Sequence, residues 1–409
     1  MPSALTCPTC DAVYEASPAE PWRCGCGHAL EFTEQPHPEG APLPLSSLDT
    51  SRGLWTFFEF LPIEPHVTFH EGFTPLVDAP EWDAAFKLEY VFPTGSFKDR
   101  GATTTLSRAV ELGVEKVIED SSGNAGAAIA TYAARAGLPA EIYVPADVKQ
   151  SKLMAIQRAG ARPVRVEGSR ADVTAACVGA VEGSSEENAP ETANGEAVGS
   201  SEARSVSERA NGEAVGTADA PYQHGDGWYA SHAWNPAFYA GTMTFAFELA
   251  AQRGWSVPDA VVLPVGHGTL FLGTYRGFER LVEAGITDRL PRLFAVQTMG
   301  YDPLVERVGG DRIVEDDETR TEIADGIQIS EPARASQLLD ALEATDGTAV
   351  AVGDGPVETA LDRLHRGGFY VEPTCAVAPA ALAHFRETGA IGPDDDVVVP
   401  LTGSGLKTL

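Results

Sequence analysis

The hydrophobic and polar positions of this chain form short β-branched runs that alternate with longer alanine-rich stretches. The runs predict strands at EKVIEDS (115–121), AEIYVP (140–145), ARPVRVEG (161–168), DAVVLPVG (259–266), RLFAVQT (292–298) and DDVVVPLTG (395–403). The alanine-rich stretches predict helices at ATYAARAG (130–137), KLMAIQRAG (152–160), TMTFAFELAAQRG (242–254) and ALDRLHRGG (360–368). Strands that alternate with helices in this way are typical of the α/β class. The pattern therefore predicts an α/β fold.

Two segments depart from this alternation. Residues 36–45, PHPEGAPLPL, are proline-rich and predict a linker between a short N-terminal segment and the main body. Residues 181–220 are rich in Ser, Glu, Gly, Ala and Asn, and ANGEAVG occurs in them twice, at 193–199 and 210–216. A segment this polar cannot bury enough apolar surface to order itself. We interpret 181–220 as a disordered acidic insertion without a catalytic role.

Four of the six cysteines lie in the N-terminal segment, residues 1–40, as CPTC (Cys7 and Cys10) and RCGCG (Cys24 and Cys26). Thirteen residues separate the pairs, close to the spacing of a zinc ribbon, in which two short loops share one tetrahedral ion. The second pair is C-x-C where C-x-x-C is commoner, so His28 is an alternative ligand. Disulfides are the other interpretation, but a reducing cytoplasm disfavours them. The pattern predicts a structural zinc, which says little about the reaction.

The chain of 409 residues is strongly acidic, with 59 Asp and Glu against 29 Lys and Arg and a net charge of −30. In dilute buffer such a field repels nucleic acid and anionic membranes. The acids are scattered over the whole chain, which favours a protein solvated in concentrated salt, where charge repulsion is screened at short range. No apolar run is long enough to span a bilayer, and the N-terminus lacks a secretory signal pattern. We expect a cytoplasmic, salt-adapted protein that binds neither nucleic acid nor membranes.

One lysine stands in an unusual setting, the turn PTGSFKDRG (93–101). Ser96 followed three residues later by Asp99 predicts a capping box that opens a helix, and GATTTLSRAVELG (101–113) supplies that helix. Lys98 would then lie in the first turn, where the helix dipole disfavours positive charge. Such a position suits an amine that must be neutral to attack a carbonyl group. The alternative is an ordinary surface lysine near a helix start.

Three glycine-rich loops directly follow predicted strands: SSGNAG (121–126), VGHGT (265–269) and LTGSG (401–405). In a parallel sheet, loops that follow strands gather at the carboxyl edge, where ligands bind. A glycine loop that leads into a helix offers backbone N–H groups to an anion. A reactive lysine together with an anion-binding loop indicates pyridoxal phosphate, because the lysine can form an imine while the loop holds the phosphate.

These motifs resemble those of the fold-type-II pyridoxal-phosphate enzymes, and of their threonine-synthase-like members in particular. The resemblance rests on PTGSFKDRG, on the preceding EGFTPL (71–76), and on NPAFYAGTMTFAFELA (235–250), and it covers the chain outside the 181–220 insertion. It implies a two-lobed, three-layer αβα enzyme with a zinc-ribbon-like segment at the N-terminus. Residues 46–95 and 221–409 would form the large cofactor-binding lobe, and residues 96–180 the small lobe.

The resemblance also implies roles for individual residues. Lys98 matches the Schiff-base lysine, Asn124 matches the asparagine that contacts the cofactor's ring hydroxyl, and Thr402 matches the hydroxyl residue that faces the pyridine nitrogen. The phosphate loop would consist of Gly266, His267, Gly268 and Thr269. Ser121, Ser122 and Glu372 are candidates for substrate contacts, and the candidates for binding a leaving phosphate are Lys149, Lys152 and Arg100. We interpret His232 as structural.

The implied reaction is that of threonine synthase, in which water and O-phosphohomoserine give threonine and phosphate. The substrate would be a small amino acid, the cofactors pyridoxal phosphate and a structural zinc, and the partner a second copy of the chain in a homodimer. Three motif details depart from the usual threonine-synthase pattern: the plain SSGNAG loop, His267, and Ser404. They leave open an ammonia-lyase acting on threonine or serine, or a β-replacement enzyme making cysteine or cysteate. The third hypothesis is a protein that senses an amino acid and has no enzymatic activity.

Overall fold

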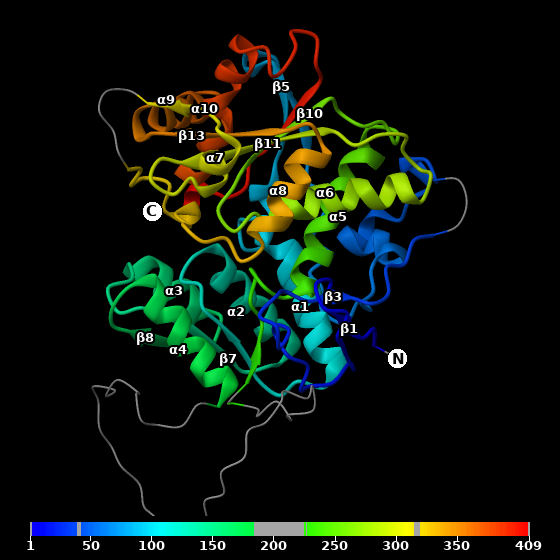
Figure 1. Cartoon of the computed structure of the whole chain (residues 1–409), viewed down its shortest axis with the longest axis vertical. Helices are drawn as coiled ribbons and strands as arrows, with labels where there is room; N and C mark the ends of the chain where they lie inside the picture. Colours follow the sequence, from blue (N-terminus) through cyan, green and yellow to red (C-terminus); the bar gives the residue numbers. More distant parts are fainter. Residues whose placement is uncertain (1, 39–41, 184–224, 226, 315–319, 408–409) are drawn as a thin grey trace, which may run out of the picture.

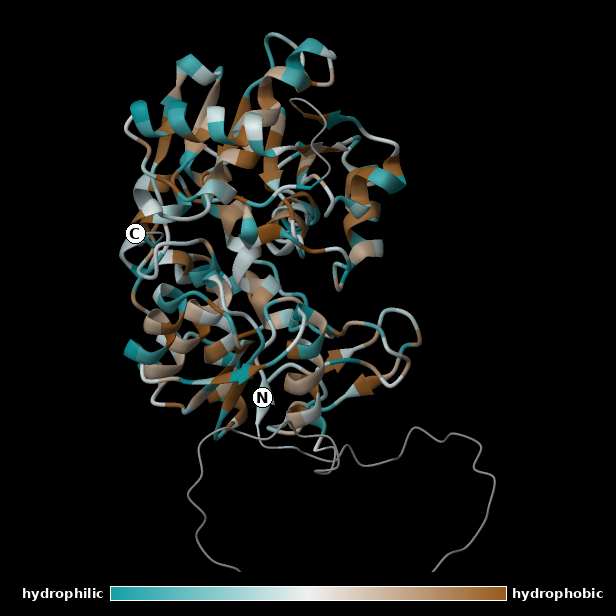
Figure 2. Cartoon of the chain, turned by 90° about the vertical axis from the view of Figure 1, so that its left-hand side faces the viewer, coloured by the Kyte–Doolittle hydropathy of each residue, from teal (hydrophilic) through white to brown (hydrophobic). Residues whose placement is uncertain are grey.

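The computed structural model describes residues 2–38, 42–183, 225, 227–314 and 320–407. These residues form two lobes, each built on its own sheet, and a small N-terminal sheet beside them (Figure 1). Figure 2 shows the strands of both lobes as largely hydrophobic and the outer helices with hydrophilic turns toward the surface. None of the described helices combines the length and the apolar character needed to cross a bilayer.

The larger lobe contains a seven-stranded sheet in the order β12-β13-β11-β10-β14-β5-β4. All of its pairings are parallel except that of β4 with β5. Its strands are β4 (Leu76–Ala79), β5 (Ala84–Lys87), β10 (Ala260–Pro264), β11 (Arg292–Thr298), β12 (Arg312–Ile313), β13 (Thr348–Val352) and β14 (Val397–Pro400).

Alternating side chains of this sheet enter two different cores, because successive residues of a strand point to opposite faces. Val261 and Leu263 of β10 pack with helices α5, α6 and α8, while Val262 packs on the other face with α9 and α10. The helices of this lobe are α5 (Pro236–Gln252), α6 (Thr269–Glu283), α7 (Pro303–Val308), α8 (Ala335–Ala344), α9 (Asp354–Arg366) and α10 (Pro373–Glu387). The lobe thus has the three-layer αβα arrangement that the sequence analysis expected.

The smaller lobe contains a four-stranded parallel sheet in the order β8-β7-β6-β9. Helices α2 and α3 pack on one face and α4 on the other. The elements are β6 (Val117–Glu119), β7 (Ala140–Pro145), β8 (Arg162–Val166), β9 (Trp228–Tyr229), α2 (Asn124–Ala136), α3 (Gln150–Arg158) and α4 (Arg170–Glu182).

Strand β9 corrects the boundary that the sequence analysis drew. We expected residues from 221 onward to belong to the large lobe, but Trp228 and Tyr229 pair with Val117 and Ile118 of β6. The chain therefore returns to the small sheet before it enters α5. Helix α4 continues to Glu182, so it takes the first two residues of the expected insertion. Residues 184–220 of that insertion lie outside the described residues.

Helix α1 (Lys98–Leu112) joins the lobes, because it packs against α2 of the small lobe and α5 of the large lobe. The N-terminal antiparallel sheet, in the order β2-β1-β3, is tied to both. Arg108 of α1 pairs with Glu20 at 2.7 Å, and Arg334 before α8 pairs with Glu31. This sheet consists of β1 (Leu5–Thr6), β2 (Val13–Tyr14) and β3 (Glu31–Phe32).

All six predicted strands and all five predicted helices, including the one at 101–113, are present. The helices extend further toward their N-termini than predicted, as in α5, which begins at Pro236 and not at Thr242. The predicted strands omitted β4, β5, β9, β12 and β13 of the two sheets. Short 3-10 helices complete the described chain: η1 (Leu45–Ser47), η2 (Thr50–Phe60), η3 (Pro80–Trp82), η4 (Glu89–Val91), η5 (Asp325–Ile327) and η6 (Gly405–Lys407).

Candidate active site

Lys98 is the first residue of α1 and lies where loops of both lobes meet. Its side chain is half-buried, and its Nζ donates a hydrogen bond to Thr269 Oγ1 at 3.2 Å. Thr269 is the first residue of α6 and directly follows the glycine loop after β10. The aromatic ring of Phe97 lies 4.5 Å from the same Nζ. The structure thus brings the predicted lysine to the predicted anion-binding loop.

The start of α1 differs from the predicted capping box. The N-cap is Phe97, without a side-chain cap, and the buried Ser96 hydroxyl has no hydrogen-bond partner among the described residues. Asp99 turns instead toward Thr94, whose backbone N–H donates to its carboxylate at 2.8 Å. Burial raises the pKa of Asp99 to about 7. The turn is therefore closed by a Thr94–Asp99 link, because Asp99 is buried on the side of α1 that faces Thr94.

Burial is also the main influence on Lys98. It lowers the pKa of the Lys98 amine to about 8, against the opposing charges of Glu119 and Glu372, which favour the ammonium form. The helix dipole, which the sequence suggested as a cause, is expected to act in the same direction as this desolvation. An amine with this pKa is mostly protonated near neutral pH, but little free energy is needed to make it a nucleophile.

The loop between β10 and α6 can accommodate an anion. Gly268 has φ +73°, and a Cβ there would lie 2.3 Å from Leu338 Cδ2, so only glycine fits without a shift. The loop leads into the N-terminus of a fifteen-residue helix, where backbone N–H groups lack partners within the helix. His267 Nδ1 is buried in this loop without a hydrogen-bond partner among the described residues. A phosphate group would supply acceptors for these donors, so the residues fit that group.

Asn124 and Glu372 face each other from the two lobes. Asn124 Nδ2, at the start of α2, donates to Glu372 Oε1 at 2.7 Å, just before α10. Glu372 is buried, and burial raises its pKa. Gly403 leaves room for this carboxylate, because a Cβ at that position would lie 2.2 Å from Glu372 Oε1. Glu372 therefore connects the first and third glycine loops, because its backbone N–H also donates to the Gly403 carbonyl at 3.0 Å.

Thr402 lies in the third loop, next to a buried thiol. Its Oγ1 is 3.4 Å from Cys375 Sγ, and the Gly403 N–H donates to the same sulfur at 2.8 Å. Burial raises the pKa of Cys375 to about 12, so the thiol stays protonated at neutral pH. The Thr402 carbonyl accepts the Phe97 N–H at 3.0 Å, which fixes the third loop beside the Lys98 turn.

The two candidate serines lie in the first loop, before α2. Ser121 is buried, and its Oγ accepts the Gly123 N–H at 3.3 Å, so its hydroxyl is turned toward its own loop. Ser122 is half-buried beside it. Both precede a helix N-terminus, the position expected for contacts with a substrate carboxylate.

Two of the three candidate phosphate-binding cations are paired elsewhere. Arg100 is fully buried and binds Glu89 and Glu248. Lys152 pairs with Asp325 across the lobes at 2.9 Å. Lys149 remains exposed at the start of α3. A leaving phosphate would therefore have to draw Lys152 away from Asp325 or rely on other residues.

A further pair near the site consists of Glu119, which was not singled out from the sequence, and His232, which was interpreted as structural. Glu119 is the last residue of β6, two residues before the start of the SSGNAG segment, and its Oε1 is 2.6 Å from His232 Nδ1. Both residues are buried. The available signal was an acid at the last position of an apolar strand, because an ionisable group at such a position needs a specific partner.

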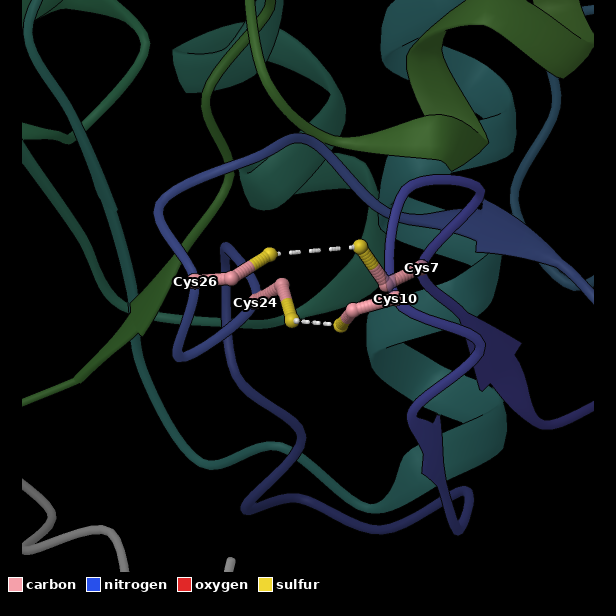
Figure 3. A group of neighbouring side chains, drawn as sticks. All are labelled: Cys7, Cys10, Cys24 and Cys26. Carbon is pink, nitrogen blue, oxygen red and sulfur yellow. Dashed lines mark hydrogen bonds between the residues drawn. The ribbon is translucent and has the colours of Figure 1, made fainter. Parts of the chain in front are cut away.

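The four N-terminal cysteines converge as predicted (Figure 3). Their sulfur atoms lie within 4.8 Å of one another, with Cys7 to Cys26 at 3.6 Å and Cys10 to Cys24 at 3.4 Å. A tetrahedral zinc with bonds of about 2.3 Å would place its sulfur ligands about 3.8 Å apart. The four thiols therefore fit zinc by number, chemistry and spacing. The alternative ligand, His28, lies beside Cys26 at 3.3 Å and is not needed to complete the set.

A half-buried lysine amine beside a glycine loop that leads into a helix, together with two further strand-end loops, is the arrangement expected of an α/β enzyme that acts through an amine. A family model for pyridoxal-phosphate dependent enzymes matches residues 67–403. The chain belongs to this family, as the motif resemblance implied.

Named relatives agree with this assignment. The chain is 31% identical to the threonine synthase of Methanosarcina acetivorans, over 87% of this chain and 80% of that protein. It is 30% identical to the threonine synthase of Synechocystis, over 90% of this chain and 87% of that protein. Among solved structures, an L-serine ammonia-lyase from Rhizomucor miehei matches with TM-score 0.60 and 22% identity, over 81% of this chain and 93% of that one. Threonine deaminase isoform 2 from Solanum lycopersicum matches with TM-score 0.58 and 19% identity, over 81% and 84%. These structures establish the shared fold.

Proposed function

We propose that this chain is a threonine synthase, which converts O-phosphohomoserine and water into threonine and phosphate. The observation that supports this most is the similarity to curated threonine synthases, which extends over most of this chain and most of each relative. The hydrogen bond between Lys98 and Thr269 adds chemical support, because it joins a lysine amine to the glycine loop that leads into α6.

We propose the following roles at the site. Lys98 holds pyridoxal phosphate covalently, and the loop Gly266, His267, Gly268 and Thr269 binds its phosphate. Asn124 contacts the oxygen on the ring, and the neutral hydroxyl of Thr402 contacts the ring nitrogen. When bound, this cofactor would stabilise the negative charge that develops on the substrate carbon next to the amine as that carbon loses its proton.

The residues of the chain then position the substrate and move protons. The Lys98 Nζ would take a proton from one substrate carbon and return it to a neighbouring one. Ser121 and Ser122 bind the substrate carboxylate at the N-terminus of α2. Glu372 holds the Asn124 amide in place through their 2.7 Å hydrogen bond.

One observation supports a second candidate, an ammonia-lyase acting on threonine or serine. Arg100 and Lys152, two of the cations proposed for a leaving phosphate, are paired with Glu89, Glu248 and Asp325. The aromatic rings of Phe97 and Phe238 lie near Lys98. A substrate without a phosphate would need no further cation at this site.

A substrate panel distinguishes the two candidates. We expect the purified full-length protein, with added pyridoxal phosphate in concentrated potassium chloride, to release phosphate and threonine in equal amounts from O-phosphohomoserine. Threonine and serine serve as parallel substrates, with keto acid and ammonia as the products measured. Keto acid from these substrates, without phosphate release from O-phosphohomoserine, would reject threonine synthase in favour of the lyase.

We also propose that Cys7, Cys10, Cys24 and Cys26 bind one structural zinc. Elemental analysis of carefully reduced protein is expected to give about one zinc per chain, because four thiolates form a complete tetrahedral set. Cys10→Ser should lower this content at least about tenfold, since one ligand is lost. Cys177→Ala, a buried thiol outside the cluster, is the control and should keep the zinc. Reduced wild-type protein without zinc would disprove the site.

Further proposals concern the setting in which the chain works. The net charge of −30 favours solvation in concentrated salt, where electrostatic repulsion is screened. We propose a cytoplasmic, salt-adapted enzyme that acts as a homodimer on a small amino acid and binds neither nucleic acid nor membranes. Stability that rose steadily as salt was removed would contradict the adaptation to salt.

A further inference from the structure

The buried pair Glu119 and His232 has no role in the reaction described so far. Glu119 Oε1 lies 2.6 Å from His232 Nδ1, and Oε2 accepts the His232 backbone N–H at 3.3 Å. Both carboxylate oxygens thus hold the same histidine. A carboxylate that binds Nδ1–H fixes the tautomer and the ring orientation, which leaves Nε2 as the nitrogen that can accept a proton.

This pair lies in the immediate surroundings of Lys98. The ring of Phe238 is 5.9 Å from Lys98 Nζ and 6.0 Å from the His232 ring, so both flank the same side chain. The His232 ring is also 5.3 Å from the ring of His267. His267 lies two residues before Thr269, which accepts the Lys98 hydrogen bond. These contacts therefore place His232 within one intervening side chain of the amine.

The arrangement of Glu119, Asp120 and His232 does not favour a metal site. Glu119, Asp120 and His232 bring potential ligand atoms within 4.8 Å of one another. Asp120, however, already accepts hydrogen bonds from Tyr229 at 2.9 Å and Thr174 at 2.6 Å, besides its contact with Arg170. Its oxygens are committed to protein donors, which leaves Glu119 and His232 as a pair.

The total charge of the pair and Lys98 permits exchange of a proton between them, even though the pKa of His232 is lowered. Burial raises the pKa of Glu119 well above its usual range, and the neighbouring Asp120, the residue after β6, adds to the effect. Burial lowers the pKa of His232, as do Lys98, His267 and Arg170. Glu372, before α10, faces Lys98 from the other side. Lys98 as ammonium beside the anionic pair has the same total charge as neutral Lys98 beside the protonated pair, so the transfer adds no buried charge.

We propose that the Glu119–His232 pair accepts the proton that Lys98 loses when its amine becomes nucleophilic. In this step the N–H bond at Lys98 Nζ breaks, its electron pair stays on Nζ, and a new N–H bond forms at His232 Nε2. The Nδ1–H bond to Glu119 is kept, so Glu119 is a positioning residue for His232. The inference depends on Lys98 being the lysine that binds the cofactor, and not on the identity of the amino-acid substrate.

The test measures how fast pyridoxal phosphate attaches to full-length protein that has been stripped of cofactor, by absorbance, across a pH series. Attachment requires neutral Lys98. His232→Gln is expected to slow it at least about tenfold near pH 6.5, where the amine starts as an ammonium and needs an acceptor. Above the Lys98 pKa of about 8, the difference should shrink to about twofold or less, because the amine is already neutral. A purely structural defect would slow attachment by the same factor at every pH, and that result would overturn the proposal.

Glu119→Gln separates proton acceptance from simple electrostatics. The Glu119 charge favours the ammonium form of Lys98, so its removal alone should lower the Lys98 pKa and speed attachment at low pH. The proposal predicts slower attachment there, and faster attachment would refute it. The matched control is His384→Gln, which breaks a surface histidine–carboxylate pair with Asp311 at 2.9 Å and should change nothing.

A measurement on the wild type keeps the proposal testable if a buried variant fails to fold. Two-bond 1H–15N spectra of the full-length protein are expected to show His232 protonated at Nδ1 and bare at Nε2 near pH 7. The opposite tautomer would overturn the proposal. If Lys98→Ala still captured the cofactor, the assignment of Lys98 itself would fail, whereas normal attachment in His232→Gln would reject only the proton acceptor.

Discussion

Lys98→Ala is expected to abolish covalent attachment of pyridoxal phosphate and to lower turnover at least about a thousandfold, because one amine both holds the cofactor and moves protons. The local structure predicts little disturbance of the fold. Lys98 is half-buried at the first position of α1, and its Nζ makes a hydrogen bond to Thr269 alone among the described residues. Absorbance of the bound cofactor, mass spectrometry after borohydride reduction, and the rate with the best substrate of the panel measure the three effects.

Lys116→Ala is the matched control for this substitution. Lys116 is a partly exposed lysine of the same lobe that pairs with Glu141 at 3.3 Å, away from the glycine loops. Surface ion pairs of this kind contribute little to stability, so the variant should bind cofactor and turn over like the wild type. If Lys98→Ala stayed coloured and active while Lys116→Ala did not, the site would have to be sought elsewhere in the chain.

The parts of the site that could be predicted from sequence are those fixed by backbone geometry. The position of a glycine loop after an apolar strand can be predicted, because parallel strands place the loops that follow them at one edge of the sheet. The 121–126, 265–269 and 401–405 loops and the Lys98 turn therefore meet as predicted, linked by Asn124–Glu372 and by Phe97–Thr402. Strands β5 and β13 escaped prediction because alanine, which is depleted in strands, interrupts the hydrophobic pattern of both AAFK and TAVAV.

Side-chain partners that are distant in sequence could not be predicted. Ser96 and Asp99 have the spacing of a capping box, but burial turns Asp99 toward Thr94. Glu119 and His232 are separated by more than a hundred residues, and they meet because β9 pairs with β6 just before His232. In the sequence, β9 comes soon after the polar segment 181–220, which has no strand pattern. The acid–histidine contact therefore depends on tertiary structure that local sequence does not encode.

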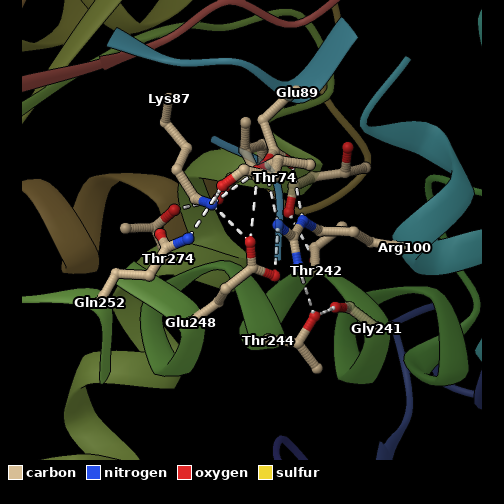
Figure 4. A network of polar contacts seen from close by, with 12 residues as sticks. Thr74, Lys87, Glu89, Arg100, Gly241, Thr242, Thr244, Glu248, Gln252 and Thr274 are labelled. Atoms are coloured by element: carbon tan, nitrogen blue, oxygen red, sulfur yellow. Dashed lines mark hydrogen bonds and ion pairs between the residues drawn. The ribbon is translucent and has the colours of Figure 1, made fainter. Parts of the chain in front are cut away.

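A buried network of charged side chains begins two residues after Lys98 (Figure 4). Arg100, two residues after Lys98, donates to Glu89 at 2.7 Å and to Glu248 of α5 at 3.0 Å. Lys87 of β5 pairs with Glu248 and donates to the Thr74 carbonyl at 2.5 Å. Two cations and two carboxylates thus balance inside the core, all without exposed side-chain surface in the ion pairs. The network ties α1 to β5 and α5.

Glu248→Gln is expected to lower the free energy of unfolding by about 3–5 kcal/mol, because it leaves two buried cations facing one carboxylate. Burial alone would raise the pKa of Glu248, but the charges of Arg100 and Lys87 outweigh it and lower that pKa. Its contribution to stability is therefore present above the unfolded carboxyl pKa of about 4.3 and is lost as pH falls through the folded value. Urea unfolding at constant potassium chloride, at neutral pH and again in acid, measures both effects.

Two further variants decide whether charge balance is the cause. Adding Lys87→Met to Glu248→Gln restores one cation per carboxylate, and we expect it to recover about half of the lost stability, since the unpaired charge costs more than the pair contributes. Asp362→Asn, which breaks the exposed Arg366–Asp362 pair, should cost less than about 0.5 kcal/mol. If Glu248→Gln cost no more than Asp362→Asn, the network would not hold the Lys98 turn, and the position of Lys98 would have to depend on the Thr94–Asp99 link and the Phe97–Thr402 hydrogen bond alone.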